Sequence, residues 1–166
     1  SPFHVTLLPD RIVVALVVPL FVTERQWISA ENRFAAISRA EAGNVIGIHC
    51  QRLGESLTYA GSDLGHVQFD EGGFPTGPAT LVYDTCRGLS TYLDMTPRER
   101  DHPTEEVMVA VHVLTHETAH LTGLVSEAEA ECWAMQHDAR TAQGLGATPA
   151  QAQALAERYW REVYPR

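Results

Sequence analysis

Lysine is absent from this chain of 166 residues, so its 12 basic residues are all arginine. The arginines are scattered without forming a basic cluster, and the formal net charge is −9. Binding to a phosphate backbone requires a basic face. The sequence therefore predicts that nucleic acid is not a partner. Acidity of this kind commonly serves solubility, and it also favours cationic ligands or a metal.

Cysteine is scarce. Cys50, Cys86 and Cys132 lie far apart, and none belongs to a C-x-x-C pair, which argues against a cysteine-rich structural zinc site. Three cysteines allow one disulfide and one free thiol, or three thiols, and the sequence does not choose between these. An exported protein would favour a bridge. Cys132 is five residues after Glu127, an offset that points its thiol away from the candidate site described below. We therefore expect Cys132 to be buried or disulfide-bonded.

A long hydrophobic run is also missing. The longest one, residues 12–22, has 11 residues, whereas a membrane-spanning helix needs about 20. Three interpretations remain open for it: a buried or docked strand, a remnant of a signal or anchor segment, and a short helix packed on the core. Pro19 weakens both regular structures. We therefore separate an apolar N-terminal segment, 1–23, from a single domain, 24–166.

The pattern of apolar and capping residues in this domain predicts mostly helices. The predicted helices cover 24–42, 81–93, the stretch after Thr104, 126–143 and 148–163. Two short strands are expected at 44–50 and 66–69, and 52–63 is expected to be a loop. The predicted fold class is α+β, a mostly helical single domain with a small β-sheet.

One motif carries chemistry. His116, Glu117 and His120 form the pattern H-E-x-x-H. Residues four apart lie on one face of a helix, about 6 Å of rise from each other, so two imidazoles can bind one zinc ion. The carboxylate of Glu117 can then reach a water on that metal. The alternative is a pair of core histidines beside a solvated glutamate.

A third ligand is expected soon after the motif, because hydrolytic zinc sites combine three protein ligands with an open position. Gly123 allows a tight turn, and six residues separate His120 from Glu127. The next helix would therefore run back along the motif helix. Glu127 would lie near the level of His120, and Glu131 one turn further, near His116.

Residues 116–136 (HETAHLTGLVSEAEAECWAMQ) resemble the gluzincin branch of zinc metallopeptidases, including small bacterial proteins with the same motif. The resemblance implies a zincin-like, minimal gluzincin fold with the sheet packed on the motif helix. It implies one Zn²⁺ per chain, bound by His116, His120 and Glu127, and Glu117 as general base. Glu131 stands where the family has an aspartate that braces a ligand histidine. The metzincin pattern fits less well, because its last position is Ser126.

The implied function is hydrolysis of peptide bonds in a peptide or protein substrate. An apolar anchor is common in such proteins, so the resemblance favours membrane proximity and the bacterial cell envelope, or secretion, over the cytoplasm. An oxyanion donor is also expected, and the sequence does not select among its candidates, which are His66, Tyr83, His102 and His112. The alternative function is a metal-stabilised binding or structural domain that keeps the site without turnover.

Overall fold

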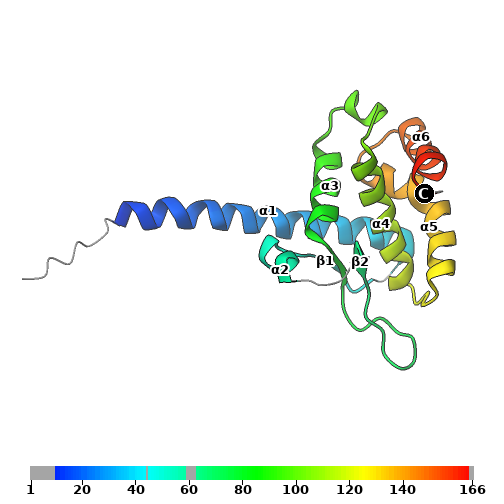
Figure 1. Ribbon diagram of the computed structural model, residues 1–166, viewed down its shortest axis with the longest axis horizontal. Coiled ribbons are helices and arrows are strands. Elements are labelled where there is room, and N and C mark those ends of the chain that lie inside the picture. Colours follow the sequence, from blue (N-terminus) through cyan, green and yellow to red (C-terminus); the bar gives the residue numbers. More distant parts are fainter. Residues whose placement is uncertain (1–9, 44, 59–62, 165–166) are drawn as a thin grey trace, which may run out of the picture.

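The computed structural model describes residues 10–43, 45–58 and 63–164, and for 10–22 and 56–58 it describes the backbone alone. Within these ranges the chain is mostly helical with one small sheet, which confirms the predicted α+β class (Figure 1). The helical elements are α1 (Asp10–Ala42), α2 (Leu53–Thr58), α3 (Tyr83–Asp94), η1 (Glu99–Asp101), α4 (Glu105–Leu121), α5 (Glu127–Gly144), α6 (Pro149–Arg158) and η2 (Tyr159–Val163).

The sheet has three short strands, β1 (Ile48–Cys50), β2 (Gly65–His66) and β3 (Ala79–Leu81), in the order β1-β3-β2. β1 runs parallel to β3, and β2 runs antiparallel to it. The sequence pattern does not predict β3, and the helix predicted over 81–93 begins at the last residue of this strand. Three residues are too few to display an alternating pattern, so this strand is defined only by its two partners.

Three other predicted elements were wrong in extent. The strand expected over 44–50 begins only at Ile48. The strand expected over 66–69 ends at His66, and Phe69 instead forms an isolated bridge with Pro75. The loop expected over 52–63 contains α2, at whose start the Arg52 N–H donates to Glu55 at 2.5 Å. Residues 1–9, 44 and 59–62, on which parts of these predictions fall, lie outside the described residues.

Helix α1 begins 14 residues before the predicted start at residue 24 and continues through Pro19. The strand interpretation of 12–22 is therefore wrong, and α1 crosses the boundary placed at residue 23. Its C-terminal part lies against the rest of the fold, while its N-terminal part projects beyond it (Figure 1). No helix among the described residues combines the length and apolar character that crossing a membrane requires.

Helix α4, which carries the motif, is the central element. Its N-terminus is capped by Thr104, whose hydroxyl accepts from the Val107 N–H at 3.4 Å, and acidic residues follow at the positive end of the helix dipole. Most of its residues are buried, because α1, α3, α5 and the sheet pack around it. The buried hydroxyl pair of Ser38 and Thr118, 2.7 Å apart, joins it to α1. These contacts fix the motif residues in space.

A disulfide links Cys50 in β1 to Cys86 in α3, and both residues are fully buried. It holds the sheet against α3 and closes a chain segment with a sequence separation of 36. Cys132 is free and exposed, so the expectation that it is buried or bridged was wrong. Its neighbour Glu131 faces α4, and one residue along a helix rotates a side chain by about 100° onto another face.

We expect the disulfide to contribute about 4 kcal/mol to the free energy of unfolding, because it restricts a loop of this length in the unfolded chain. The Cys50→Ala/Cys86→Ala double variant should lose this amount in urea denaturation. The matched control is Cys132→Ser, which removes an exposed thiol and should change the free energy by less than about 0.5 kcal/mol. Equal unfolding midpoints for the double variant and the parent would contradict the expectation.

Candidate metal centre

Three histidines follow one another along one side of α4, a turn apart each. The ring centroids of His112 and His116 are 6.1 Å apart, and those of His116 and His120 are 4.8 Å apart. This is the consequence of i, i+4 spacing in a helix. Glu117 is the residue after His116, so its side chain is rotated by about 100° around the helix axis. Its carboxylate therefore faces a different neighbouring element than the histidine rings do.

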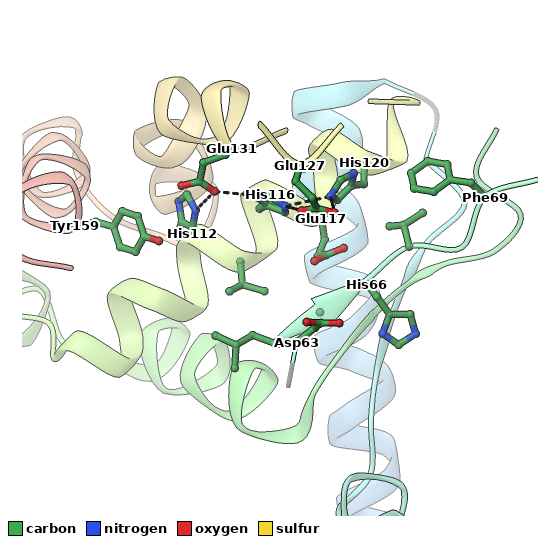
Figure 2. A pocket seen from close by; sticks show the side chains of 14 residues that line it. Asp63, His66, Phe69, His112, His116, Glu117, His120, Glu127, Glu131 and Tyr159 are labelled. Carbon is green, nitrogen blue, oxygen red and sulfur yellow. Dashed lines mark hydrogen bonds and ion pairs between the residues drawn. The ribbon is translucent and has the colours of Figure 1, made fainter. Parts of the chain in front are cut away.

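The chain reverses directly after α4 and brings glutamates to these rings. Gly123 takes a φ of +95°, a left-handed conformation that glycine adopts without strain. Ser126 then caps α5 by accepting from the Glu129 N–H. Glu127 and Glu131, one turn apart on α5, therefore face the histidines of α4 (Figure 2).

The outer nitrogen of each motif histidine is held by an acceptor. Nδ1 of His120 lies 2.6 Å from the carbonyl oxygen of Leu124, and Nδ1 of His116 lies 3.0 Å from a carboxylate oxygen of Glu131. A carbonyl only accepts, and so does an ionised carboxylate. Both Nδ1 atoms therefore carry the proton in the neutral rings, and both Nε2 atoms are left with a lone pair.

These lone pairs converge on Glu127. The two Nε2 atoms of His116 and His120 are 3.0 Å apart, and they lie 3.0 and 3.4 Å from the carboxylate oxygens of Glu127. With both rings neutral, three acceptors thus meet without a donor hydrogen between them. A cation at the centre satisfies all three at once, so His116, His120 and Glu127 form a group that could hold a metal ion.

The spacing of the three acceptors fits a tetrahedral centre. Bonds of 2.0–2.2 Å to nitrogen and oxygen, the range for zinc, place two ligands of a tetrahedron about 3.3–3.5 Å from each other. The observed separations of 3.0–3.4 Å are close to this value. The three residues are the ligands predicted from the sequence, and the structure brings them together.

Glu131 lies between two imidazoles rather than at the centre. One of its oxygens accepts from Nδ1 of His116 at 3.0 Å and from Nε2 of His112 at 3.1 Å. The hydrogen bond from His112 lowers the pKa of Glu131 and keeps it ionised. A second possible metal group, His112, His116 and Glu131, is thereby accounted for by hydrogen bonds. Glu131 makes the contact with His116 that the sequence predicts.

His112 is itself held between two carboxylates. Its Nδ1 is 2.9 Å from Asp138, which is 1% exposed. Burial alone would lower the pKa of His112, but hydrogen bonds to Asp138 and Glu131 outweigh it and raise that pKa to about 9. Tyr159 stacks on the ring with centroids 4.1 Å apart, a favourable arrangement for an imidazolium. A line of buried and half-buried polar groups thus leads from Asp138 to His116.

Glu117 is 4% exposed, and its Oε2 atom is buried without a hydrogen-bond partner among the described residues. Burial raises the pKa of Glu117 to about 8, and the nearby carboxylates of Glu127 and Asp63 add to the effect. A buried carboxyl group that holds its proton near neutral pH is suited to exchange it there. Such perturbed groups are frequent at functional sites.

The candidate ligands and Glu117 border one cavity of about 600 Å³ (Figure 2). Its lining contains both predicted ligand histidines, Glu117, Glu127 and Glu131. It also contains His112 and, from β2, His66. His66 therefore remains a candidate for contact with a ligand in this cavity.

The structure places the other three oxyanion-donor candidates either outside the lining of this cavity or with their ring nitrogens engaged. Tyr83 does not line this cavity and instead packs on Trp27, with ring centroids 5.5 Å apart. His102 is exposed at the end of η1 and does not line the cavity either. His112 does line it, but both of its nitrogens are engaged by Asp138 and Glu131, which leaves no N–H for a substrate.

The sequence analysis missed Asp138, Tyr159, Asp63 and Phe69. Asp138 follows Glu131 by seven residues, which is two turns of α5. The two side chains therefore lie on the same face of the helix, and this spacing could have identified Asp138 from the sequence. Tyr159 is brought to His112 from the C-terminal η2 by tertiary packing alone. Phe69 contacts the edge of His120, with ring centroids 5.8 Å apart, from the loop after β2.

Comparison of the chain with protein-family models, curated proteins and solved structures finds no match.

The His112 imidazole should stay doubly protonated at pH 7.5 and lose a proton with a midpoint near pH 9. Long-range ¹H–¹⁵N spectra of its ring measure this directly. Asp138→Asn should lower the midpoint, because it removes one of the two charges. The pKa of a histidine in the unfolded chain is about 6.5. The protonated His112 ring therefore contributes its full share to the free energy of unfolding below pH 6.5, and this contribution is lost as the pH rises through 9. A neutral ring at pH 7.5 would contradict the assignment.

Proposed function

We propose that this protein is a zinc-dependent metallopeptidase of minimal gluzincin type, a hydrolase acting on peptide bonds. The observation that supports this most is the convergence of the His116, His120 and Glu127 acceptors beside a buried carboxyl, Glu117, in one cavity. Two imidazoles and one carboxylate are a donor set of catalytic zinc sites. The cavity gives a peptide access to that group.

His116, His120 and Glu127 would hold the ion. Zinc at this position would lower the pKa of a bound water to about 7 and polarise the scissile carbonyl. Leu124 and Glu131 orient the two ligand rings through the opposite nitrogens, which is how such ligands are commonly fixed. In its ionised form, which a nearby cation would favour, Glu117 accepts the proton of a water in the cavity and passes it to the departing amine.

The disulfide supports the proposed location outside the cytoplasm. Disulfides persist in oxidising compartments and are rare where thiols are kept reduced. Cys50 and Cys86 form a fully buried bridge between β1 and α3. We therefore propose the cell envelope or secretion as its location. A peptide or protein substrate is the partner that the proposed activity requires.

Zinc binding should depend on Glu127. Removing a residue that is hydrogen-bonded to a metal ligand typically costs 10–100-fold in metal affinity. Glu127 is itself a candidate ligand, so Glu127→Ala should lower the zinc affinity by about 100-fold or more, as measured by calorimetric titration. The matched control is Glu129→Ala. Glu129 is an exposed glutamate in the same turn of α5, and it does not line the cavity. This control variant should bind zinc like the parent. A Glu127→Ala variant that holds zinc as tightly as the parent would overturn the ligand assignment.

Hydrolysis should depend on Glu117. The zinc-loaded protein is incubated with a mixed peptide library, and new termini are identified by mass spectrometry. Glu117→Gln should lower cleavage by about 10²–10⁴-fold, the usual contribution of a general base, while zinc affinity stays close to that of the parent. A chelator should abolish cleavage by the parent. A parent that binds zinc and cleaves nothing would instead favour the metal-stabilised binding domain.

A further inference from the structure

We infer that Gly65 in β2 is a positioning residue for Glu117: the strand has no side chain at this point, and the Glu117 carboxyl group occupies the space thus left. This inference deepens the proposed function and rests on it. In Figure 2, the Glu117 carboxylate lies on the side of α4 that faces the strand carrying His66. Gly65 is the residue directly before His66 in that strand.

The contact leaves no room for a methyl group. A Cβ atom on Gly65 would lie 2.8 Å from Cγ and from Oε1 of Glu117, and 3.0 Å from Cδ. Carbon atoms pack at 3.5–4.0 Å. The overlap involves the middle of the Glu117 side chain as well as its end, so rotation of the carboxylate alone does not relieve it.

The backbone does not require a glycine at this position. The described glycines with a positive φ are Gly43, Gly47, Gly73, Gly123 and Gly146, and Gly65 is not among them. It lies in a strand and pairs with Leu81 of β3. Any residue can adopt this conformation. What glycine provides here is therefore space beside Glu117.

The strand is held firmly enough to act as a support. The carbonyl oxygen of Leu64, the preceding residue, accepts from the Val82 N–H at 3.1 Å and from the Thr85 hydroxyl at 3.0 Å. β3 in turn pairs with β1, whose Cys50 is bridged to Cys86 in α3. A methyl group on Gly65 would therefore displace Glu117 rather than the strand.

Displacement of Glu117 has a direct chemical consequence. A general base must lie within about 2.6–3.2 Å of the proton that it accepts. Glu117 is 4% exposed and lines the cavity, so the open direction for it is into the cavity. A shift of about 1 Å there removes the base from its position, and a misplacement of this size can cost about 10²-fold in rate.

The test compares Gly65→Ala with Gly77→Ala, whose added Cβ would meet nothing within 4 Å. Both are assayed as zinc-loaded proteins on a peptide that the parent cleaves. Gly65→Ala should lower kcat by about 10- to 100-fold and leave KM and zinc affinity within about twofold of the parent, whereas Gly77→Ala should leave all three unchanged. An unchanged kcat, or a zinc affinity that falls in step with kcat, would overturn the inference.

A second measurement covers a Gly65→Ala variant that is too unstable to assay. Its loss in thermal unfolding midpoint is compared with the loss that Gly65→Ala causes in a Glu117→Ala background. If the added methyl group acts through its contact with Glu117, the loss in unfolding midpoint should largely disappear in the Glu117→Ala background. An equal loss in both backgrounds would overturn the inference. A parent that binds zinc without cleaving any peptide removes the proposed function and the catalytic role together, while the midpoints still decide whether Gly65 fixes the Glu117 side chain.

Discussion

Three hydrogen-bond acceptors face one another across the interface of α4 and α5, and the surrounding structure is arranged to hold them there. Nε2 of His116 and of His120 lie 3.0 Å apart and both lie against the Glu127 carboxylate. The opposite nitrogens donate to groups that only accept, so the inner lone pairs have no proton to share. Such a group is unfavourable by itself and becomes favourable around a cation. This arrangement makes the helical hairpin a group that could hold a metal ion.

Two sides of α4 serve two different parts of the site. On the side of α5, Glu131 connects His116 to the buried imidazolium of His112, which Asp138 and the Tyr159 ring hold in place. This network ties η2 to the candidate metal centre. On the side of the sheet, β2 approaches Glu117 closely. The candidate ligand His116 and the candidate base Glu117 are thus held by separate neighbours, although they are adjacent in the sequence.

The parts of the site that the sequence predicted are those set by short-range geometry. His116, His120, Glu127 and Glu131 were placed by the repeat of the helix and by the turn at Gly123, and the structure has them where this spacing puts them. The helix caps at Thr104 and Thr148 were likewise local signals. Short-range patterns therefore predicted the helices and the candidate ligands together.

What the sequence did not predict depends on contacts between distant segments. Nothing local distinguishes Tyr83, which turns toward Trp27 and away from the cavity, from Tyr159, which reaches His112. β3 is too short to show a pattern and is defined by its pairing with β1 and β2. The pairing of Cys50 with Cys86 follows from the same packing of the sheet on α3. These features required the tertiary fold.

The most direct test of the account is a crystal structure of the zinc-soaked protein with anomalous diffraction data collected on both sides of the zinc edge. One strong anomalous peak per chain is expected, within about 2.0–2.2 Å of Nε2 of His116, Nε2 of His120 and a carboxylate oxygen of Glu127. No peak at that position, or a peak bound by other residues in its place, would contradict the account.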